Sequence, residues 1–120
     1  MIAAFLVGCT PGQKQENTYR QIGMDEAITI MNERDGYIIL DVRRPDEFAA
    51  GHIPGAINVP NESIGDRDIP ELPDKGQLIL VYCRSGNRSK QASAKLAKLG
   101  YTNILEFGGI LDWPGDIVTE

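Results

Sequence analysis

Two uninterrupted apolar runs place the strongest limit on how this chain can fold. Residues 37–40 read Tyr-Ile-Ile-Leu, and residues 77–82 read Gln-Leu-Ile-Leu-Val-Tyr. Neither run alternates apolar and polar residues, as a strand with one face in water does. Short runs of this composition are typical of strands that are covered on both faces. The two runs therefore predict an α/β fold, in which a mostly parallel central sheet has helices on both faces.

The segments around these runs are typical of helices. Apolar residues recur at helical spacing over residues 24–31. We expect further helices at residues 45–51 and 88–99 and a short one at residues 110–113, with a third strand at residues 103–107. Strands that alternate with helices are joined by right-handed crossovers, which favours parallel pairing of the strands.

The charge and the cysteine content exclude several classes of protein. The 120 residues include 12 Lys and Arg against 17 Asp and Glu, a net charge of -5, which argues against a surface that binds nucleic acid. Two cysteines and one histidine cannot form a disulfide-rich scaffold or a Cys/His zinc site. We therefore expect no metal and no nucleic-acid partner. We also expect a monomer.

A change in composition near residue 10 divides the chain. Residues 1–8 are uncharged and mostly apolar, but a membrane-spanning helix needs about 20 such residues. The stretch after Cys9 is polar and typical of a linker. We predict an apolar N-terminus and a polar linker over residues 1–21, followed by a single domain over residues 22–118.

Cys9 has two interpretations. The tetrapeptide Leu6-Val7-Gly8-Cys9 resembles the lipobox of bacterial lipoproteins, in which the cysteine is lipidated and becomes the mature N-terminus. This resemblance makes Cys9 a candidate lipidation site that tethers a bacterial protein to a membrane outside the cytoplasm, and it excludes a disulfide with Cys83. A signal peptide also opens with a basic region, which is not seen before the apolar run. An incidental cysteine in a cytoplasmic protein is the alternative.

A cysteine-containing loop follows the second apolar run. Residues 83–89 read Cys-Arg-Ser-Gly-Asn-Arg-Ser and lie between a predicted strand and a predicted helix. Ligands of open α/β sheets bind at this carboxyl edge of the strands. Gly86 allows the backbone to curl so that successive N–H groups form an anion-binding nest. Because Arg84 and Arg88 add two positive charges, we expect the loop to hold Cys83 as a thiolate.

A comparison of free energies indicates that the whole loop is needed to lower the pKa of the Cys83 thiol. Lowering the pKa of a thiol from about 8.5 to about 6.5 requires about 2.7 kcal/mol. A helix N-terminus contributes roughly 0.3–1 kcal/mol, whereas each hydrogen bond to a charged group contributes about 1.5–3 kcal/mol. Several amide donors and an arginine must therefore converge on Cys83. The alternative is a small, inert thiol buried at a strand end, which does not account for the flanking arginines.

Five cations and no acid lie between residues 84 and 98, namely Arg84, Arg88, Lys90, Lys95 and Lys98. Helical spacing places the three lysines on an outward face. Such a face is ordinarily a solvated surface. The alternative is a positive rim that steers an anionic donor or an acidic partner protein toward Cys83.

Three segments of the chain, in this order, resemble the signatures of the rhodanese domain. They are residues 40–60, the loop at residues 83–89 and residues 107–114. The resemblance covers about residues 22–117. It implies the rhodanese-like three-layer fold, which agrees with the α/β fold predicted from the apolar runs.

The resemblance also implies a sulfurtransferase. In this family a loop cysteine carries sulfane sulfur as a persulfide, so Cys83 is the expected catalytic residue. The rest of the loop is expected to bind substrate and consists of Arg84, Ser85, Gly86, Asn87, Arg88 and Ser89. The expected partners are a small anionic sulfur donor such as thiosulfate and an acceptor such as cyanide or a thiol. No cofactor is expected.

Four residues outside the loop are candidates for supporting roles. Asp41 ends a predicted strand at the same sheet edge as Cys83, so we expect it to orient the loop or an arginine. Arg43 is expected to form an internal ion pair. Asp41 and Arg43 are both predicted to support the site without contacting the substrate. We expect a structural hydrogen bond from His52 and a position near the mouth of the site for Glu47.

Two other functions stay open. Rhodanese-related phosphatases and arsenate reductases have five residues between the loop cysteine and the loop arginine, whereas four separate Cys83 from Arg88. The shorter loop makes this chemistry the lesser alternative. The other alternative is a persulfide carrier, a sensor or a protein-interaction module that does not turn over small molecules.

Overall fold

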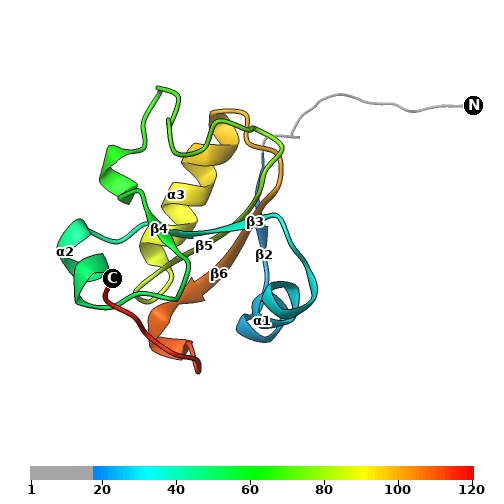
Figure 1. The fold of residues 1–120 in the computed structure, drawn as a ribbon. Coiled ribbons are helices and arrows are strands. Elements are labelled where there is room, and N and C mark those ends of the chain that lie inside the picture. The colour runs from blue at the N-terminus through cyan, green and yellow to red at the C-terminus, as the bar shows by residue number, and fades with distance from the viewer. Residues whose placement is uncertain (1–17) are drawn as a thin grey trace, which may run out of the picture.

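The computed structural model describes residues 18–120, so Cys9 and the rest of residues 1–17 lie outside the described residues. The sheet has five parallel strands in the order β2-β6-β5-β3-β4. Figure 1 shows α1 on one side of this sheet and α3 on the other. The predicted α/β fold, a parallel sheet between helices, is confirmed.

The elements follow one another in an alternating order. The strands are β2 (Arg20–Gln21), β3 (Tyr37–Asp41), β4 (Ile57–Asn58), β5 (Leu78–Cys83) and β6 (Ile104–Gly109). The helices are α1 (Met24–Glu33), α2 (Pro45–Ala50) and α3 (Asn87–Lys98), with the 3-10 turns η2 (Asn61–Ser63) and η3 (Ile110–Asp112). The described strands are therefore joined by helices or longer loops, as parallel pairing requires.

β5 lies at the centre of the sheet, and every residue in it is buried. Its side chains alternate between the two faces. Ile79, Val81 and Cys83 pack in the core that contains residues of α3, whereas Leu80 and Tyr82 pack in the core that contains residues of α1. Because β5 runs parallel to its neighbours, it brings Cys83 to the edge of the sheet at which β3 also ends.

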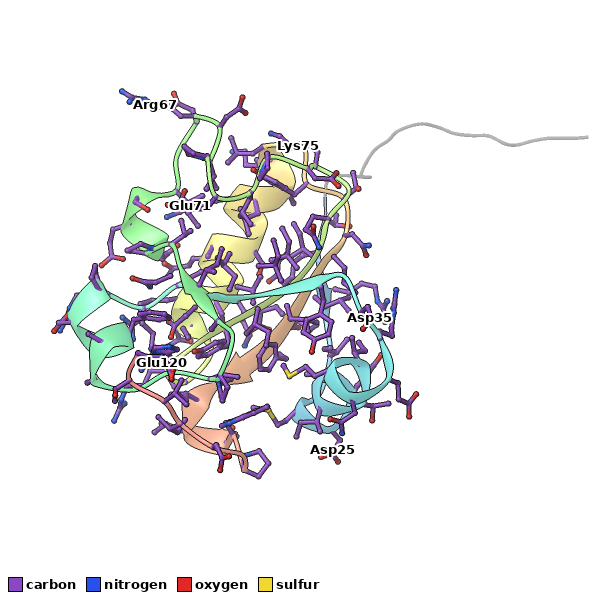
Figure 2. The ribbon with its side chains drawn as sticks, viewed as in Figure 1. Asp25, Asp35, Arg67, Glu71, Lys75 and Glu120 are labelled. Atoms are coloured by element: carbon purple, nitrogen blue, oxygen red, sulfur yellow. The ribbon has the colours of Figure 1, made fainter. Side chains whose placement is uncertain are left out.

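Charged side chains cover the outside of the molecule. Asp25, Asp35 and Arg67 are exposed and point away from the sheet, while other side chains fill the space between the sheet and the helices (Figure 2). Within residues 18–120, none of the helices has the length and the apolar character that crossing a membrane requires.

The structure differs from the sequence-based expectation at its shortest elements. Arg20 and Gln21 lie in the predicted linker, yet they form β2 and pair with Leu105 and Glu106 of β6. β4 is equally short and pairs with β3. Two-residue strands carry no apolar periodicity from which they could be predicted. The last predicted helix, at residues 110–113, is a single 3-10 turn.

Candidate active site

Cys83 is the last residue of β5 and lies at the carboxyl edge of the sheet. Its side chain is 1% exposed, and the N–H of Gly86 donates a hydrogen bond to its Sγ at 3.0 Å. Gly86 has a φ of 116°, in the region that glycine adopts without strain. This conformation turns the amide back toward the sulfur just before α3 begins. The curled backbone expected at Gly86 is therefore present.

The surroundings of the thiol favour its ionised form. Burial opposes ionisation of Cys83. The hydrogen bond with the side chain of Ser89 and those from the amides of Ser89, Gly86 and Ser85 outweigh this effect and lower the pKa of the thiol. The principal donors are neutral, whereas the argument from the sequence required an arginine as well.

A pair of glycines in β6 allows the loop to lie close to the sheet. Gly109 pairs with Cys83 after a shift in register, and a Cβ at Gly109 would clash with the carbonyl oxygen of Arg84. The N–H of Leu111 donates to the same oxygen at 3.2 Å. Gly108 has a φ of 97°, which also suits glycine. The end of β6 therefore fixes the base of the cysteine loop.

The loop residues predicted to bind substrate separate into exposed and buried groups. Arg84, Ser85 and Asn87 are exposed. Gly86 and Ser89 are buried, and both contact the sulfur of the cysteine. The exposed residues are accessible to a ligand, whereas the buried residues act on the thiol itself.

Arg88 is paired with Glu47 of α2. Its Nη1 and Nη2 lie 2.6 Å and 3.1 Å from the two carboxylate oxygens. The hydrogen bonds from Arg88 lower the pKa of Glu47 to about 2, against a smaller opposing effect of burial. Glu47 thus lies beside the loop and balances the positive charge of Arg88. The sequence analysis assigned this charge to the binding of an anionic donor. The pair links α2 to the start of α3.

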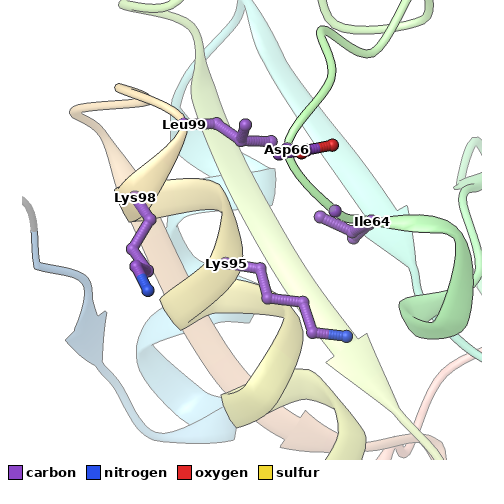
Figure 3. A pocket seen from close by; sticks show the side chains of 6 residues that line it. Ile64, Asp66, Lys95, Lys98 and Leu99 are labelled. Atoms are coloured by element: carbon purple, nitrogen blue, oxygen red, sulfur yellow. The ribbon is translucent and has the colours of Figure 1, made fainter.

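Two of the lysines that the alternative of a positive rim would require lie away from Cys83. Lys95 and Lys98 lie in the last turn of α3, at the end farther from the loop, and line a separate pocket of about 550 Å³ (Figure 3). The Nζ of Lys95 donates to the backbone and side-chain oxygens of Asn61 at 2.9 Å and 3.0 Å. Of the three lysines predicted on an outward face, Lys90 and Lys98 are exposed and Lys95 is half-buried, because oxygen acceptors of η2 lie within its reach.

Asp41 and Arg43 form a buried ion pair at the end of β3. Arg43 Nη2 lies 2.6 Å from Asp41 Oδ2 and 2.7 Å from the carbonyl oxygen of Gly51. The hydroxyl of Tyr82 donates to Asp41 Oδ2 at 2.7 Å. The internal ion pair predicted for Arg43 is confirmed. Because Asp41 lies opposite Tyr82 in the sheet, the pair braces the strand residue that precedes Cys83.

His52 has a structural environment. Its Nδ1 lies 2.8 Å from the carbonyl oxygen of Phe48, and the two rings stack with their centroids 3.7 Å apart. The backbone of His52 also pairs with Val118, which holds the C-terminal segment beside α2 (Figure 1). The predicted structural hydrogen bond of this histidine is confirmed.

The argument from the sequence does not identify Glu106 as a residue of the site. Glu106 lies in β6 and is 2% exposed, and its Oε2 accepts hydrogen bonds from Ser89 Oγ at 2.5 Å and from the N–H of Gly108 at 3.0 Å. An acid inside the strand predicted at residues 103–107 is the signal that could have identified it, because burying such a group is costly.

A comparison with known sequences decides the family. The family described as Rhodanese-like domain matches residues 24–115, a range that includes the Cys83 loop and the glycine pair of β6. The chain belongs to the rhodanese-like domain family. The resemblance predicted from three segments of the sequence is confirmed.

Several relatives carry names that describe an activity. Thiosulfate sulfurtransferase PspE of Escherichia coli is 38% identical over 73 residues, which cover 61% of this chain and 70% of that protein. Thiosulfate sulfurtransferase GlpE of Pseudomonas entomophila is 33% identical over 91 residues, which cover 76% of this chain and 80% of that protein. The prediction of a rhodanese-like enzyme is confirmed.

Solved structures agree with the fold. A rhodanese-related protein from Thermoplasma volcanium superposes with a TM-score of 0.70 at 30% identity, over 85% of this chain and 100% of the other. A rhodanese with anions from E. coli superposes with a TM-score of 0.63 at 34% identity, over 70% of this chain and 99% of the other. These proteins therefore share the rhodanese-like architecture with this chain over most of its length and not only at the sequence motifs.

Proposed function

We propose that this protein is a sulfurtransferase that carries sulfane sulfur as a persulfide on Cys83. The donor is a small anion such as thiosulfate, and the acceptor is cyanide or a thiol. The observation that carries the proposal is the environment of the sulfur, where the amide of Gly86 donates at 3.0 Å and neutral donors lower the pKa of a buried thiol. A lowered pKa increases the share of the thiolate, which is the nucleophilic form of a cysteine.

The reaction has two nucleophilic steps. The Cys83 thiolate attacks the outer sulfur of thiosulfate, a new S–S bond forms, and the bond to the sulfonate group breaks so that sulfite leaves with its electron pair. The acceptor then attacks the outer sulfur of the persulfide and releases the thiolate. Covalent catalysis of this kind replaces one difficult transfer with two easier ones.

The loop supplies the electrostatics of these steps. Arg84 is exposed beside the cysteine, where its permanent charge attracts an anionic donor. Arg88 is held by Glu47, so its main contribution is to fix the start of α3 and the amides that point at the sulfur. We therefore assign donor capture chiefly to Arg84.

Steady-state formation of thiocyanate from thiosulfate and cyanide tests the proposal. We expect turnover by the wild type, none by Cys83→Ser, and a raised KM for thiosulfate with Arg84→Gln. Arg20→Gln is a matched control, because Arg20 is an exposed arginine of the edge strand β2. A wild type that accepts no sulfur from thiosulfate or another sulfane donor contradicts the proposal. Loading of sulfur without turnover would identify a carrier instead.

For Cys9, which lies outside the described residues, we propose lipidation and a membrane tether on the strength of the Leu6-Val7-Gly8-Cys9 sequence. Expression of the full gene product with a labelled fatty acid, followed by membrane fractionation, tests this. We expect label in the membrane fraction for the wild type and not for Cys9→Ala. A soluble, unlabelled wild type contradicts the tether.

A further inference from the structure

The two arginines of the cysteine loop differ in what holds them. Arg84 is exposed and forms no salt bridge within residues 18–120. Arg88 is paired through both of its terminal nitrogens with the two carboxylate oxygens of Glu47, at 2.6 Å and 3.1 Å. Of the two cations in the loop, Arg84 is therefore the one without a counter-ion in this part of the chain.

Glu47 is fixed in place by hydrogen bonds from two sides. Its Oε1 accepts from the N–H of Arg44 at 3.0 Å, which caps the start of α2. The same oxygen accepts from Arg88 Nη1. The side chains of Arg88 and Glu47 are only 27% and 20% exposed, so water and salt screen this pair less than they screen a surface pair. The cap of α2 thus directs the carboxylate at the guanidinium.

Arg88 is near enough to the nucleophile to act on an anion that binds there. It is the second residue of α3, and its charge interacts with that of Cys83. A guanidinium binds an oxyanion most strongly through two parallel N–H groups. Glu47 occupies Nη1 and Nη2 of Arg88, so these groups are not available to an anionic donor.

We propose that Glu47 is a specificity-determining residue that holds Arg88 away from anions at Cys83 and thereby makes the site favour donors of lower charge. The inference rests on the proposed function in that the donor is an anion that reacts with Cys83. Thiosulfate carries two negative charges and an alkyl thiosulfonate carries one. Because Coulomb energy is proportional to charge, the loss of a cation weakens the capture of thiosulfate more. The favoured substrate class is the singly charged sulfane donor.

Other contacts keep the loop in shape when Glu47 is replaced. The carbonyl oxygen of Gly86 accepts hydrogen bonds from the N–H of Lys90 and from the hydroxyl of Ser89, and neither bond involves the ion pair. In Glu47→Gln the side-chain oxygen can still accept from the N–H of Arg44, so the cap of α2 is retained. The substitution therefore removes the ion pair and leaves the starts of both helices in place.

Alkylation of Cys83 by two reagents of similar shape tests the proposal. Iodoacetamide is neutral and iodoacetate carries one negative charge, and with each reagent the thiolate displaces iodide as the S–C bond forms. The rates are measured at pH 7 by mass spectrometry of the Cys83 peptide. We expect Glu47→Gln to raise the ratio of the iodoacetate rate to the iodoacetamide rate by about threefold or more. The ratio cancels a change in the reactivity of the thiol itself, and its rise should shrink at high salt.

Sulfur donors of different charge give the matching experiment on turnover. Thiosulfate releases sulfite and the methanethiosulfonate ion releases methanesulfinate when Cys83 attacks the outer sulfur. With cyanide as the acceptor, kcat/KM for the donor reports the donor step of the two-step exchange. We expect Glu47→Gln to raise kcat/KM for thiosulfate more than for methanethiosulfonate, chiefly through a lower KM for thiosulfate.

Three variants separate the holding of Arg88 from a change in overall charge. Asp46→Asn removes a charge from the same turn of α2, but the partner of Asp46 is Arg44. Glu62→Gln removes an exposed acid whose charge also acts on Arg88. Both should change the alkylation ratio less than Glu47→Gln does. Glu47→Asp keeps the charge on a shorter side chain that reaches Arg88 poorly, so its ratio should lie between those of the wild type and Glu47→Gln.

The effect of Glu47 should depend on Arg88. In the background of Arg88→Gln, Glu47→Gln should raise the alkylation ratio by a smaller factor than in the wild type, because no guanidinium is released. Should Glu47→Gln fail to fold, Glu47→Asp takes its place in the comparison. A raised ratio in Glu47→Asp then supports the proposal, and the wild-type ratio overturns it.

An unchanged alkylation ratio in Glu47→Gln, or an equal rise in Asp46→Asn, overturns the inference. An equal rise with and without Arg88 also overturns it, because Glu47 would then repel anions by its own charge alone. Alkylation requires no sulfur transfer, so the expected ratios in a protein that forms no persulfide refute the proposed function alone. Persulfide formation with an unchanged ratio refutes the role of Glu47 alone.

Discussion

Two buried carboxylates lie toward the same edge of the sheet, and their partners differ. Asp41 at the end of β3 is fully buried and is held by Arg43 and by the hydroxyl of Tyr82. Glu106 in β6 is almost as deeply buried but contacts the neutral groups of Ser89 and Gly108. The carboxylate paired with a permanent cation serves as a fixed brace at the end of β3. The carboxylate among neutral donors instead holds the hydroxyl of Ser89, which lies beside the sulfur of Cys83.

Asp41→Asn should have the largest effect on stability. The amide leaves the guanidinium of Arg43 buried without its counter-ion, a change that typically costs about 3–5 kcal/mol. Urea unfolding monitored by circular dichroism measures the loss. A loss below about 1 kcal/mol would mean that Asp41 and Arg43 do not form the brace described above, and the contrast with Glu106 would disappear.

Glu47 is a third carboxylate of intermediate burial and should show an intermediate effect. Because its pKa is lowered from 4.5 to about 2 in the folded state, its pairing with Arg88 stabilises the protein above pH 4.5 and this contribution is lost as the pH falls to about 2. We expect Glu47→Gln to be less stable than the wild type at pH 7 by roughly 1 kcal/mol, after allowance for solvent screening of the pair.

Denaturant unfolding of both proteins between pH 2 and pH 7 measures this difference. The difference in the free energy of unfolding between wild type and Glu47→Gln should shrink as the pH falls toward 2, provided that both proteins remain folded there. A gap that is independent of pH would show that Glu47 acts through packing and not through its charge.

Glu106→Gln should have the smallest effect on stability, although it is the same acid-to-amide change as Asp41→Asn. No cation is left unpaired, and the amide can still hydrogen-bond to Ser89 and Gly108, so we expect a change within about 1 kcal/mol. Parallel urea unfolding of the two variants gives the comparison directly. Equal losses in the two variants would contradict the distinction between Asp41, paired with a cation, and Glu106, held by neutral partners.

The elements of this fold that follow from sequence are those with a local cause. The apolar run at residues 78–82 predicts a fully buried central strand, and Gly86 predicts the curled loop after it, because both effects act within a few neighbouring residues. The short strands β2 and β4 were not predictable, since hydrogen bonds to strands distant in sequence define them.

The same distinction applies to the site. The loop from Cys83 to Ser89 is contiguous, so the sequence alone brings its residues together. The pairing of Glu47 with Arg88 joins residues 41 positions apart, and the contact of Ser89 with Glu106 joins residues 17 positions apart. Such contacts depend on the register of the strands and on the packing of helices, which no local pattern encodes.

The central claim is that Cys83 accepts sulfane sulfur, and one measurement tests it most directly. The wild type and Cys83→Ser are incubated with thiosulfate, and the intact mass and the mass of the Cys83 peptide are recorded under conditions that preserve persulfides. The proposal predicts one added sulfur atom, located on Cys83, in the wild type and none in Cys83→Ser. A wild-type Cys83 that gains no sulfur, or an equal gain in Cys83→Ser, would contradict it.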